Sequence, residues 1–202
     1  MAFVSVLLCS CAGVGADIVL NSDNSGTMTL EYSLSRSLES LGKQDGNERW
    51  LPVPVGRADF ERSIQRLPGM KLLSFSSKDN GRDLIISVKL QFANMEVLVR
   101  FFDPSGERAV YEKSGASSQL LFNLGGADRA GLSANSPVAN FFKSVSEGYY
   151  VNISMTLPVE GTLDAPSLPE AKLVTAGKKL SCSIPLGAVL LSREDFILKF
   201  RW

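Results

Sequence analysis

The sequence contains no histidine, few cysteines and no excess charge of either sign, with 21 Lys and Arg residues against 21 Asp and Glu. Histidine is the usual general base near neutral pH and the commonest zinc ligand, so its absence excludes triads that run through histidine and disfavours a zinc site. Zero net charge removes the attraction that a phosphate backbone requires. We therefore expect no nucleic-acid partner, no metal and no cofactor.

The sequence motifs for catalysis or ligand binding that do not need histidine are incomplete. The segment 21–26 spaces oxygen side chains as in a calcium loop, but the twelfth position, which needs a bidentate Glu, is Tyr32. Asp59 and Glu61 lie two residues apart, hence on different faces of the expected helix. No glycine pattern matches a phosphate cradle. The sequence thus predicts that the protein is not an enzyme; the catalytic alternative is a hydrolase whose carboxylates are brought together by the fold.

A hydrophobic run long enough to span a bilayer is also missing. Residues 1–16, MAFVSVLLCSCAGVGA, carry no charge, but a membrane-spanning helix needs about 20 apolar residues. Such a segment is typical of an export signal, although the basic residues that usually begin one are absent. We predict an export segment over 1–16 and a single domain over 17–202. A buried N-terminal strand is the alternative for the apolar run.

Two processing sites compete within this segment. Leu8-Cys9-Ser10-Cys11 resembles a lipobox, which would make Cys11 the first mature residue and the site of lipid attachment, with palmitate among the acyl chains. Val14-Gly15-Ala16 is a small-x-small site that would release a soluble chain beginning at Asp17. We favour Cys11. This predicts a lipid-anchored protein of the bacterial cell envelope, facing the periplasm or the cell surface, with the membrane as a partner.

Hydrophobic periodicity predicts an α+β domain, in which a mainly antiparallel sheet of hairpins carries three or four short helices. The expected strands are 17–20, 27–34, 70–77, 83–92, 108–113, 119–124, 149–157, 180–191 with a break at 185–187, and 196–202. The expected helices are 35–41, 57–67, 93–102 with Asn94 as its cap, and one through 138–145. For 93–102 a strand is the alternative, because Val97, Val99 and Phe101 alternate. The Pro- and Gly-bearing segment 158–169 is expected to be a loop.

Four phenylalanines could line an apolar cavity between sheet and helices, namely Phe101, Phe102, Phe141 and Phe142. At their spacing they equally suit an ordinary core. Cys182, the one thiol of the body, suits a small buried position. Two kinds of binding stay open. We favour a protein-interaction or structural module with an exposed apolar patch or open sheet edge, over a carrier of an acyl chain or other lipid.

Two segments, 17–32 and 54–62, resemble predicted exported lipoproteins of spirochaetes. The lipobox at Cys11, the opening hairpin with Asp23-Asn24-Ser25-Gly26 and the strand end at Leu157-Pro158 are similar to the LppM family of bacterial lipoproteins. That resemblance implies an envelope-associated protein in contact with lipid or glycolipid. The chain differs from the LppM pattern because it reaches Trp202 without a C-terminal transmembrane helix, so only the N-terminal lipid is expected to hold it. The resemblance assigns no functional residue.

Overall fold

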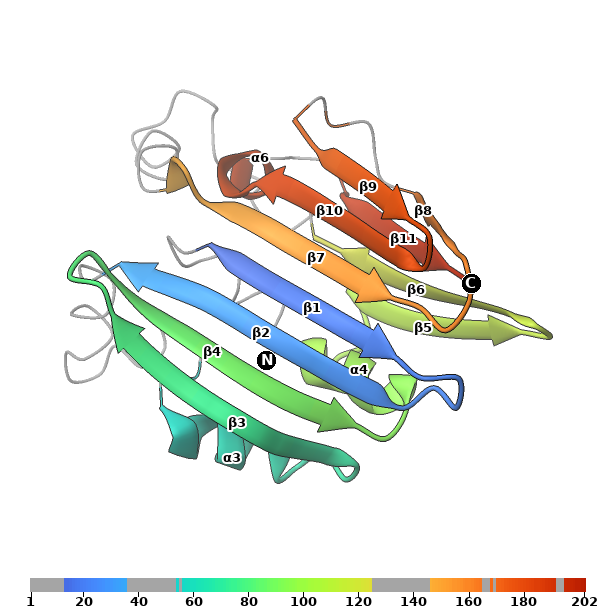
Figure 1. Ribbon diagram of the computed structural model, residues 1–202, viewed down its shortest axis with the longest axis horizontal. Coiled ribbons are helices and arrows are strands. Elements are labelled where there is room, and N and C mark those ends of the chain that lie inside the picture. The colour runs from blue at the N-terminus through green and yellow to red at the C-terminus, as the bar shows by residue number, and fades with distance from the viewer. Residues whose placement is uncertain are drawn as a thin grey trace.

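The structure, a computed structural model, describes residues 13–35, 54, 56–124, 146–164, 168, 170–191 and 195–202. Within them the predicted α+β class is confirmed, because antiparallel hairpins dominate and short helices pack on them (Figure 1). The elements are β1 (Val14–Leu20), β2 (Gly26–Ser35), α3 (Arg57–Ile64), β3 (Met70–Asp79), β4 (Asp83–Phe92), α4 (Met95–Phe102), β5 (Ala109–Ser114), β6 (Ser117–Asn123), β7 (Tyr150–Thr156), β8 (Thr162–Asp164), β9 (Lys172–Ala176), β10 (Lys179–Pro185), α6 (Leu186–Leu191) and β11 (Ile197–Arg201).

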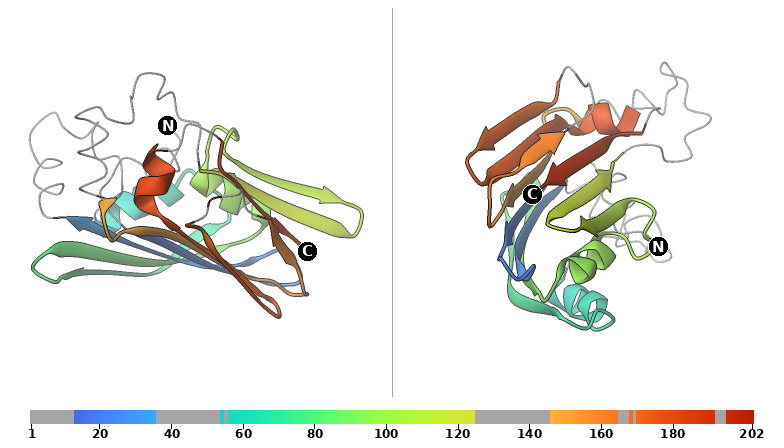
Figure 2. Two further views of the ribbon diagram at one scale, coloured as in Figure 1. Left: turned by 90° about the horizontal axis from the view of Figure 1, so that it is seen from above. Right: turned by 90° about the vertical axis from the view of Figure 1, so that its right-hand side faces the viewer.

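The strands form two sheets instead of the single sheet that the sequence suggested. The large sheet has the order β3-β4-β2-β1-β7-β10-β9, and the small sheet has the order β5-β6-β11-β8. Figure 2 shows the large sheet curving around α3 and α4, with the small sheet on the same side. Each sheet is apolar on one face, and placing the two apolar faces and the helices against one another buries both around one core.

Strand β1 lies at the centre of the large sheet. It pairs antiparallel with β2, where Ile18 lies opposite Met28, and parallel with β7, where Ile18 lies opposite Met155. The strand begins at Val14, so the last three residues of the expected export segment belong to it. Val14 and Ala16 are buried with Ile18 on its inner face. Residues 1–12 of that segment, including Cys11, lie outside the described residues.

Helix α4 forms as predicted, because the Asn94 side chain accepts a hydrogen bond from the backbone N–H of Val97, 2.9 Å away, at its first turn. The helix buries Met95, Leu98, Phe101 and Phe102. Phe102 packs edge-on against Phe122 of β6, at 5.2 Å between ring centres, and Phe122 packs edge-on against Phe200 of β11, at 6.3 Å. These aromatic contacts hold the small sheet to the helix layer.

Two predictions for the C-terminal third were wrong in detail, and one strand was missed. Segment 186–191 is helix α6 instead of a continued strand, and among its described side chains Leu186 and Val189, three residues apart, are buried on one face. The expected loop 158–169 contains β8, which pairs with β11. Strand β9 was not predicted, because all five of its residues are exposed and show no alternation. Of the other expected helices, 36–41 and 138–145 lie outside the described residues, and Ser35 belongs to β2.

Gly26 is the residue at which the β1–β2 hairpin tolerates no side chain. A Cβ there would lie 2.2 Å from the backbone oxygen of Val19 and 2.5 Å from Cζ of Phe92. We expect Gly26→Ala to lower the free energy of unfolding by about 1–3 kcal/mol, the usual cost of overpacking. Urea denaturation measures this value. The matched control is Gly15→Ala in β1, whose added Cβ meets only Glu31 O at 3.8 Å; equal losses for both variants would contradict the account.

Candidate functional site

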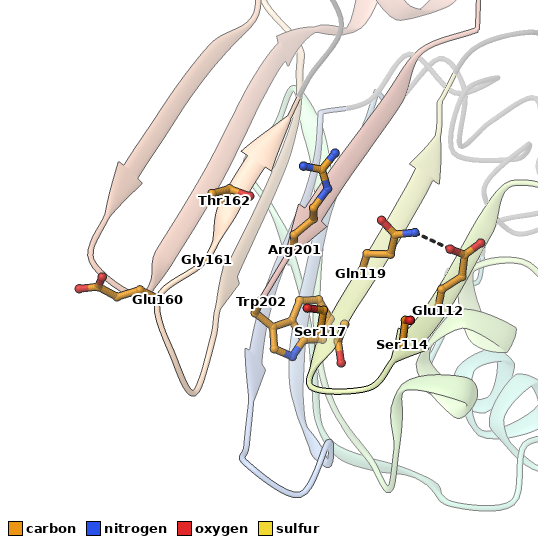
Figure 3. Close-up of a pocket in the computed structure, with 10 residues that line it drawn as sticks. Glu112, Ser114, Ser117, Gln119, Glu160, Gly161, Thr162, Arg201 and Trp202 are labelled. Atoms are coloured by element: carbon orange, nitrogen blue, oxygen red, sulfur yellow. Dashed lines mark hydrogen bonds between the residues drawn. The ribbon is translucent and has the colours of Figure 1, made fainter.

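Two hollows and one strand edge are the described features of the surface that could receive a ligand or partner. The first hollow, here the sheet-end hollow, has a volume of about 420 Å³ and lies where β5, β6, β8 and β11 meet. Its lining residues are Glu112, Ser114, Ser117, Ser118, Gln119, Glu160, Gly161, Thr162, Arg201 and Trp202 (Figure 3). Most of these side chains are polar.

Backbone contacts fix the shape of the sheet-end hollow. Ser118 and Trp202 exchange both backbone hydrogen bonds, at 2.7 and 3.0 Å between nitrogen and oxygen, and the Trp202 ring stacks on Tyr111 at 6.1 Å between ring centres. Gly161 approaches β11 so closely that a Cβ there would lie 2.4 Å from the backbone oxygen of Arg201. One wall therefore requires glycine.

The polar groups of this hollow bind one another. Arg201 Nη2 lies 2.6 Å from Asp164 Oδ2, with both side chains about half exposed, and the Gln119 amide donates a hydrogen bond to Glu112. Figure 3 shows Glu160 on the far side of the hollow from Glu112, with its carboxylate directed away from Trp202. Two carboxylates that share acid–base work must converge on one reacting atom, and these two do not.

The second hollow, here the outer-face hollow, has a volume of about 480 Å³ and lies on the face of the large sheet that points away from the helices. The sheet register places Gly15 between Glu31 of β2 and Asn152 of β7, and the missing side chain leaves a depression. Asp17 accepts a hydrogen bond from Ser154 and lies 3.4 Å from Lys179 Nζ. Both carboxylates in this hollow are exposed.

Cys182 lies beneath the outer-face hollow and is not a reactive thiol. The side chain is 2% exposed, and burial raises the pKa of the Cys182 thiol to about 11. The thiolate is the nucleophilic and metal-binding form, so a thiol with this pKa is largely inert at neutral pH. Among the described residues, no group of three or more His, Cys, Asp or Glu side chains could hold a metal ion.

Two carboxylates are buried in the described part of the chain, and both are used for folding. Asp83, 7% exposed, accepts a hydrogen bond from the Tyr149 hydroxyl at 3.0 Å, which ties the start of β4 to the residue before β7. Arg82 lies over the Tyr149 ring, 5.7 Å from its centre. Asp103, which is fully buried, ends helix α4 and accepts hydrogen bonds from the turn that follows it. Neither faces a second carboxylate among the contacts described.

The phenylalanines proposed for an apolar cavity divide between described and undescribed parts of the chain. Phe101 and Phe102 are 3% and 4% exposed, and their rings pack on each other at 5.8 Å between centres. Neither lines the sheet-end hollow or the outer-face hollow. Phe141 and Phe142 lie outside the described residues. The cavity therefore stays a prediction from the sequence.

Strand β9 is an edge strand of the large sheet, and it contacts β8 of the small sheet. Its five residues are all exposed, Leu173 to 45% and Val174 to 56%, and among the described strands it pairs only with β10. Unpaired N–H and C=O groups on such an edge can accept another strand. Below, the β9 edge means residues Lys172–Ala176.

The other edge strands carry features that discourage strand addition. Strand β3 contains a β-bulge at Leu72 and Ser74, carries Lys71, Lys78 and Asp79, and contacts α3. Strand β5 carries Glu112 and Lys113 and contacts α4, and β8 has three residues. Bulges, charges, covering helices and short length are the usual protections of a sheet edge. The β9 edge has one charge, Lys172, at its beginning.

The sequence reasoning missed the β9 edge and the sheet-end hollow. The signal for the first was present, because Leu173, Val174 and Thr175 have high strand propensity and Gly177 supplies the turn before β10 at φ 58°. The signal for the second was absent, because Gly161 and Trp202 come together only through pairing of β8 with β11.

Comparison with known proteins gives a weak likeness to a solved structure. No family model and no curated protein matches the chain. Among solved structures, the chain is similar to the NMR structure of the folded domain of the Mycobacterium tuberculosis LppM protein, at 12% identity and a TM-score of 0.49, over 95% of this chain and 89% of that one. No helix in the described part is long and apolar enough to cross a membrane.

The hydrogen-bonded carboxylate of Asp103 should make the folded protein less stable in acid. Burial would raise the pKa of its carboxyl, but hydrogen bonds from Ser105, Arg108 and Ala109 outweigh burial and lower it. A lowered pKa in the folded state stabilises the protein above the unfolded pKa of about 3.9, and this contribution is lost as pH falls through the folded value. The substitution Asp103→Asn should lower the free energy of unfolding by about 2 kcal/mol at neutral pH, which is the usual contribution of hydrogen bonds to a charged group.

The measurement is urea unfolding of both proteins from pH 7 down to about pH 3, a range that brackets the reference pKa. The difference between wild type and Asp103→Asn should shrink as pH falls. Asp23, whose pKa is also lowered by its hydrogen bonds with Ser25 but which lies on the surface, gives the control Asp23→Asn, for which we expect a much smaller difference at every pH. If the difference in unfolding free energy between wild type and Asp103→Asn stays constant across this pH range, the stabilising role of the Asp103 carboxylate is contradicted.

Proposed function

We propose that the protein is a non-enzymatic interaction module, held at a bacterial envelope membrane by a lipid on Cys11, that binds a partner polypeptide by strand addition at the β9 edge. The observation that carries the proposal is this edge, with its exposed apolar side chains and a single charged residue, Lys172. Main-chain hydrogen bonds would supply affinity, and side chains on the two faces of β9 would supply selectivity.

The outer-face hollow supports the same assignment. It is lined by Lys172 and Val174 of β9 together with side chains of β10, β7, β1 and β2, so a partner added at the edge would have a polar depression beside it. The lining is mostly Ser, Thr, Asn and charged side chains, which suits polar contacts at the rim of a protein interface. An acyl chain would need an enclosed cavity, whereas both described hollows are open to the surface and lie among residues that are mostly of polar type.

The position of β1 supports the lipid anchor over the soluble form. Cleavage after Ala16 would remove Val14, Gly15 and Ala16 from the central strand, and with them two buried side chains and their pairing with β2 and β7. Cleavage before Cys11 leaves β1 whole, with two residues, Ala12 and Gly13, between the modified cysteine and the strand. The mature protein would then be anchored next to the middle of its large sheet.

The anchor is tested by incorporation of labelled palmitate in a bacterial host that processes lipoproteins. We expect labelling of the wild type, loss of labelling in Cys11→Ala, and retention in the matched variant Cys9→Ala, because only the cysteine that follows the cleavage site is acylated. Cell fractionation should move Cys11→Ala out of the membrane fraction. Equal labelling of all three proteins, or of none, would refute the anchor.

The binding surface is tested by a photo-activatable cross-linking residue placed at Val174 in cells. The matched control is the same residue at Val19, which is 40% exposed on the same face of the same sheet but lies on the central strand β1. We expect a discrete protein adduct from position 174, identified by its cross-linked peptide, and little from position 19. Adding Leu173→Lys should reduce the adduct, since a charge on an edge strand opposes pairing. Equal adducts at both positions, or lipid adducts alone, would contradict strand addition.

A further inference from the structure

We propose that the end of the large sheet at which β1 begins lies against the bilayer that holds the lipid anchor, with Tyr150 and Arg82 among the phospholipid headgroups. Below, the tether end means Arg82, Tyr149 and Tyr150. The inference rests on the proposed function, because it names the surface that the anchored domain turns to the membrane. In Figure 1 the starts of β1, β4 and β7 lie at the left-hand end of the large sheet, and the β1–β2 hairpin lies at the other end.

The chain between the anchor and the tether end is short. Gly13 is fixed at this end, because its backbone oxygen accepts a hydrogen bond from Ser33 N at 3.0 Å and a Cβ on it would lie 3.5 Å from Cδ1 of Tyr149. Cys11 is two residues before Gly13, and two residues of chain span at most about 8 Å. The headgroup region on one side of a bilayer is about 5–8 Å thick. An acylated Cys11 therefore holds the tether end within reach of the headgroups, whatever path the intervening chain takes.

The side chains of the tether end have the chemistry of a membrane interface. Tyr150 is 41% exposed on the outer face of β7, since its neighbour Val151 is buried on the inner face. The Arg82 side chain is 76% exposed, and its guanidinium lies 5.7 Å from the centre of the Tyr149 ring. Tyrosine and arginine both have an apolar body and a polar tip, which suits them to the layer between hydrocarbon and water. The tether end can thus enter the headgroup layer without burying a charge in hydrocarbon.

Contacts within the protein already order this surface. The Tyr149 hydroxyl donates a hydrogen bond to Asp83 Oδ1 at 3.0 Å, and Arg82 Nε lies 3.8 Å from Asp83 Oδ2. Asp83 is itself buried at the start of β4, so it holds both side chains against the end of the sheet. A surface that is ordered before it binds loses less conformational entropy on contact.

Two other described surfaces of the large sheet fit a bilayer less well. The turn 21–25 at the far end contains Asp23 and no basic or aromatic residue, and the length of β1 places it about 20 Å from the tether end. The outer face carries the exposed carboxylates of Asp17 and Glu31. Pressing that face onto a bilayer would remove water from both charges, which costs free energy.

Net charge does not select the tether end. In the β3–β4 hairpin and the approach to β7, the exposed basic residues Lys78 and Arg82 are matched in number by the exposed acidic residues Asp79 and Glu147. The contact therefore depends on the lipid tether and on Tyr150 more than on attraction to anionic lipids. We expect it to persist at high salt, which screens exposed charges.

Photo-labelling from the headgroup layer tests this contact on the anchored protein. The wild type, isolated from a host that processes lipoproteins, is reconstituted in vesicles of phosphatidylethanolamine and phosphatidylglycerol. A small share of the phosphatidylethanolamine carries a photoreactive group on its headgroup, and mass spectrometry locates the attachment sites. We expect these sites to concentrate in 78–83 and 147–150 and to be rare in the turn 21–25, at low and at high salt.

The role of Tyr150 is tested by Tyr150→Ser. The matched control is Val19→Ser, because Val19 is 40% exposed on the same outer face but lies opposite Thr27, close to the far end. We expect Tyr150→Ser to lower the share of attachment in 78–83 about fivefold, through loss of an aromatic ring from the interface, and Val19→Ser to leave it unchanged. Counting only 78–83 keeps the altered residue out of the measurement, and circular dichroism melting curves check that both variants fold.

The outcomes separate this inference from the proposed function. If the isolated chain carries no acyl group, the anchor is wrong and the membrane contact is wrong with it. If the chain is acylated but attachment is even over the surface, concentrates in 21–25, or is absent from the tether end, the contact is wrong and the anchor stands. Attachment that disappears at high salt, or that Tyr150→Ser leaves unchanged, also overturns the contact as stated.

Discussion

The pairing of β1 on both sides is the constraint on which the fold depends. This strand joins the N-terminal hairpins, through β2, to the C-terminal strands, through β7, and its β7 ladder is parallel. A parallel pair needs a long connection, and here the connection includes β3 to β6 and both helices α3 and α4. Loss of residues from β1 would therefore weaken the contact between the two halves of the large sheet as well as one hairpin.

The same constraint explains the two faces of the large sheet. Alternation along β1 turns Val14, Ala16, Ile18 and Leu20 toward the helices and leaves Gly15, Asp17 and Val19 outside. Because all strands of one sheet share this alternation, the outer face becomes a polar surface on which the outer-face hollow lies, and the inner face becomes the core. The candidate surfaces of this sheet are thus what remains after the core is built: one polar face and the edge of its last strand.

Much of the fold could be predicted from the sequence because its signals are local. The hairpin of β3 and β4 follows from alternation around Asn80-Gly81, and α4 follows from the cap at Asn94 and its apolar spacing. The short β8 could not be predicted in this way, since it has three residues and depends on pairing with β11. Strand β9 has residues of high strand propensity, but all five are exposed, so no alternation of buried and exposed positions marks it. The division into two sheets is likewise a property of long-range pairing.

The candidate sites were harder to predict for a related reason. The sequence drew attention to phenylalanines, which the described part of the chain uses at Phe101 and Phe102 as core, and to Cys11, which lies outside it. Neither the β9 edge nor the two hollows contains a motif. Each arises where strands distant in sequence end together or where an edge is left without a neighbour, and only the three-dimensional arrangement brings those features to the surface.

The central claim is that the mature protein keeps β1 whole and is anchored immediately before it. The most direct test is the intact mass of the protein isolated from the membranes of a host that processes lipoproteins. The account predicts a chain that begins at Cys11 and carries the added mass of the acyl groups. A mass that corresponds to an unmodified chain beginning at Asp17 would contradict it, because the central strand would then lack its first three residues.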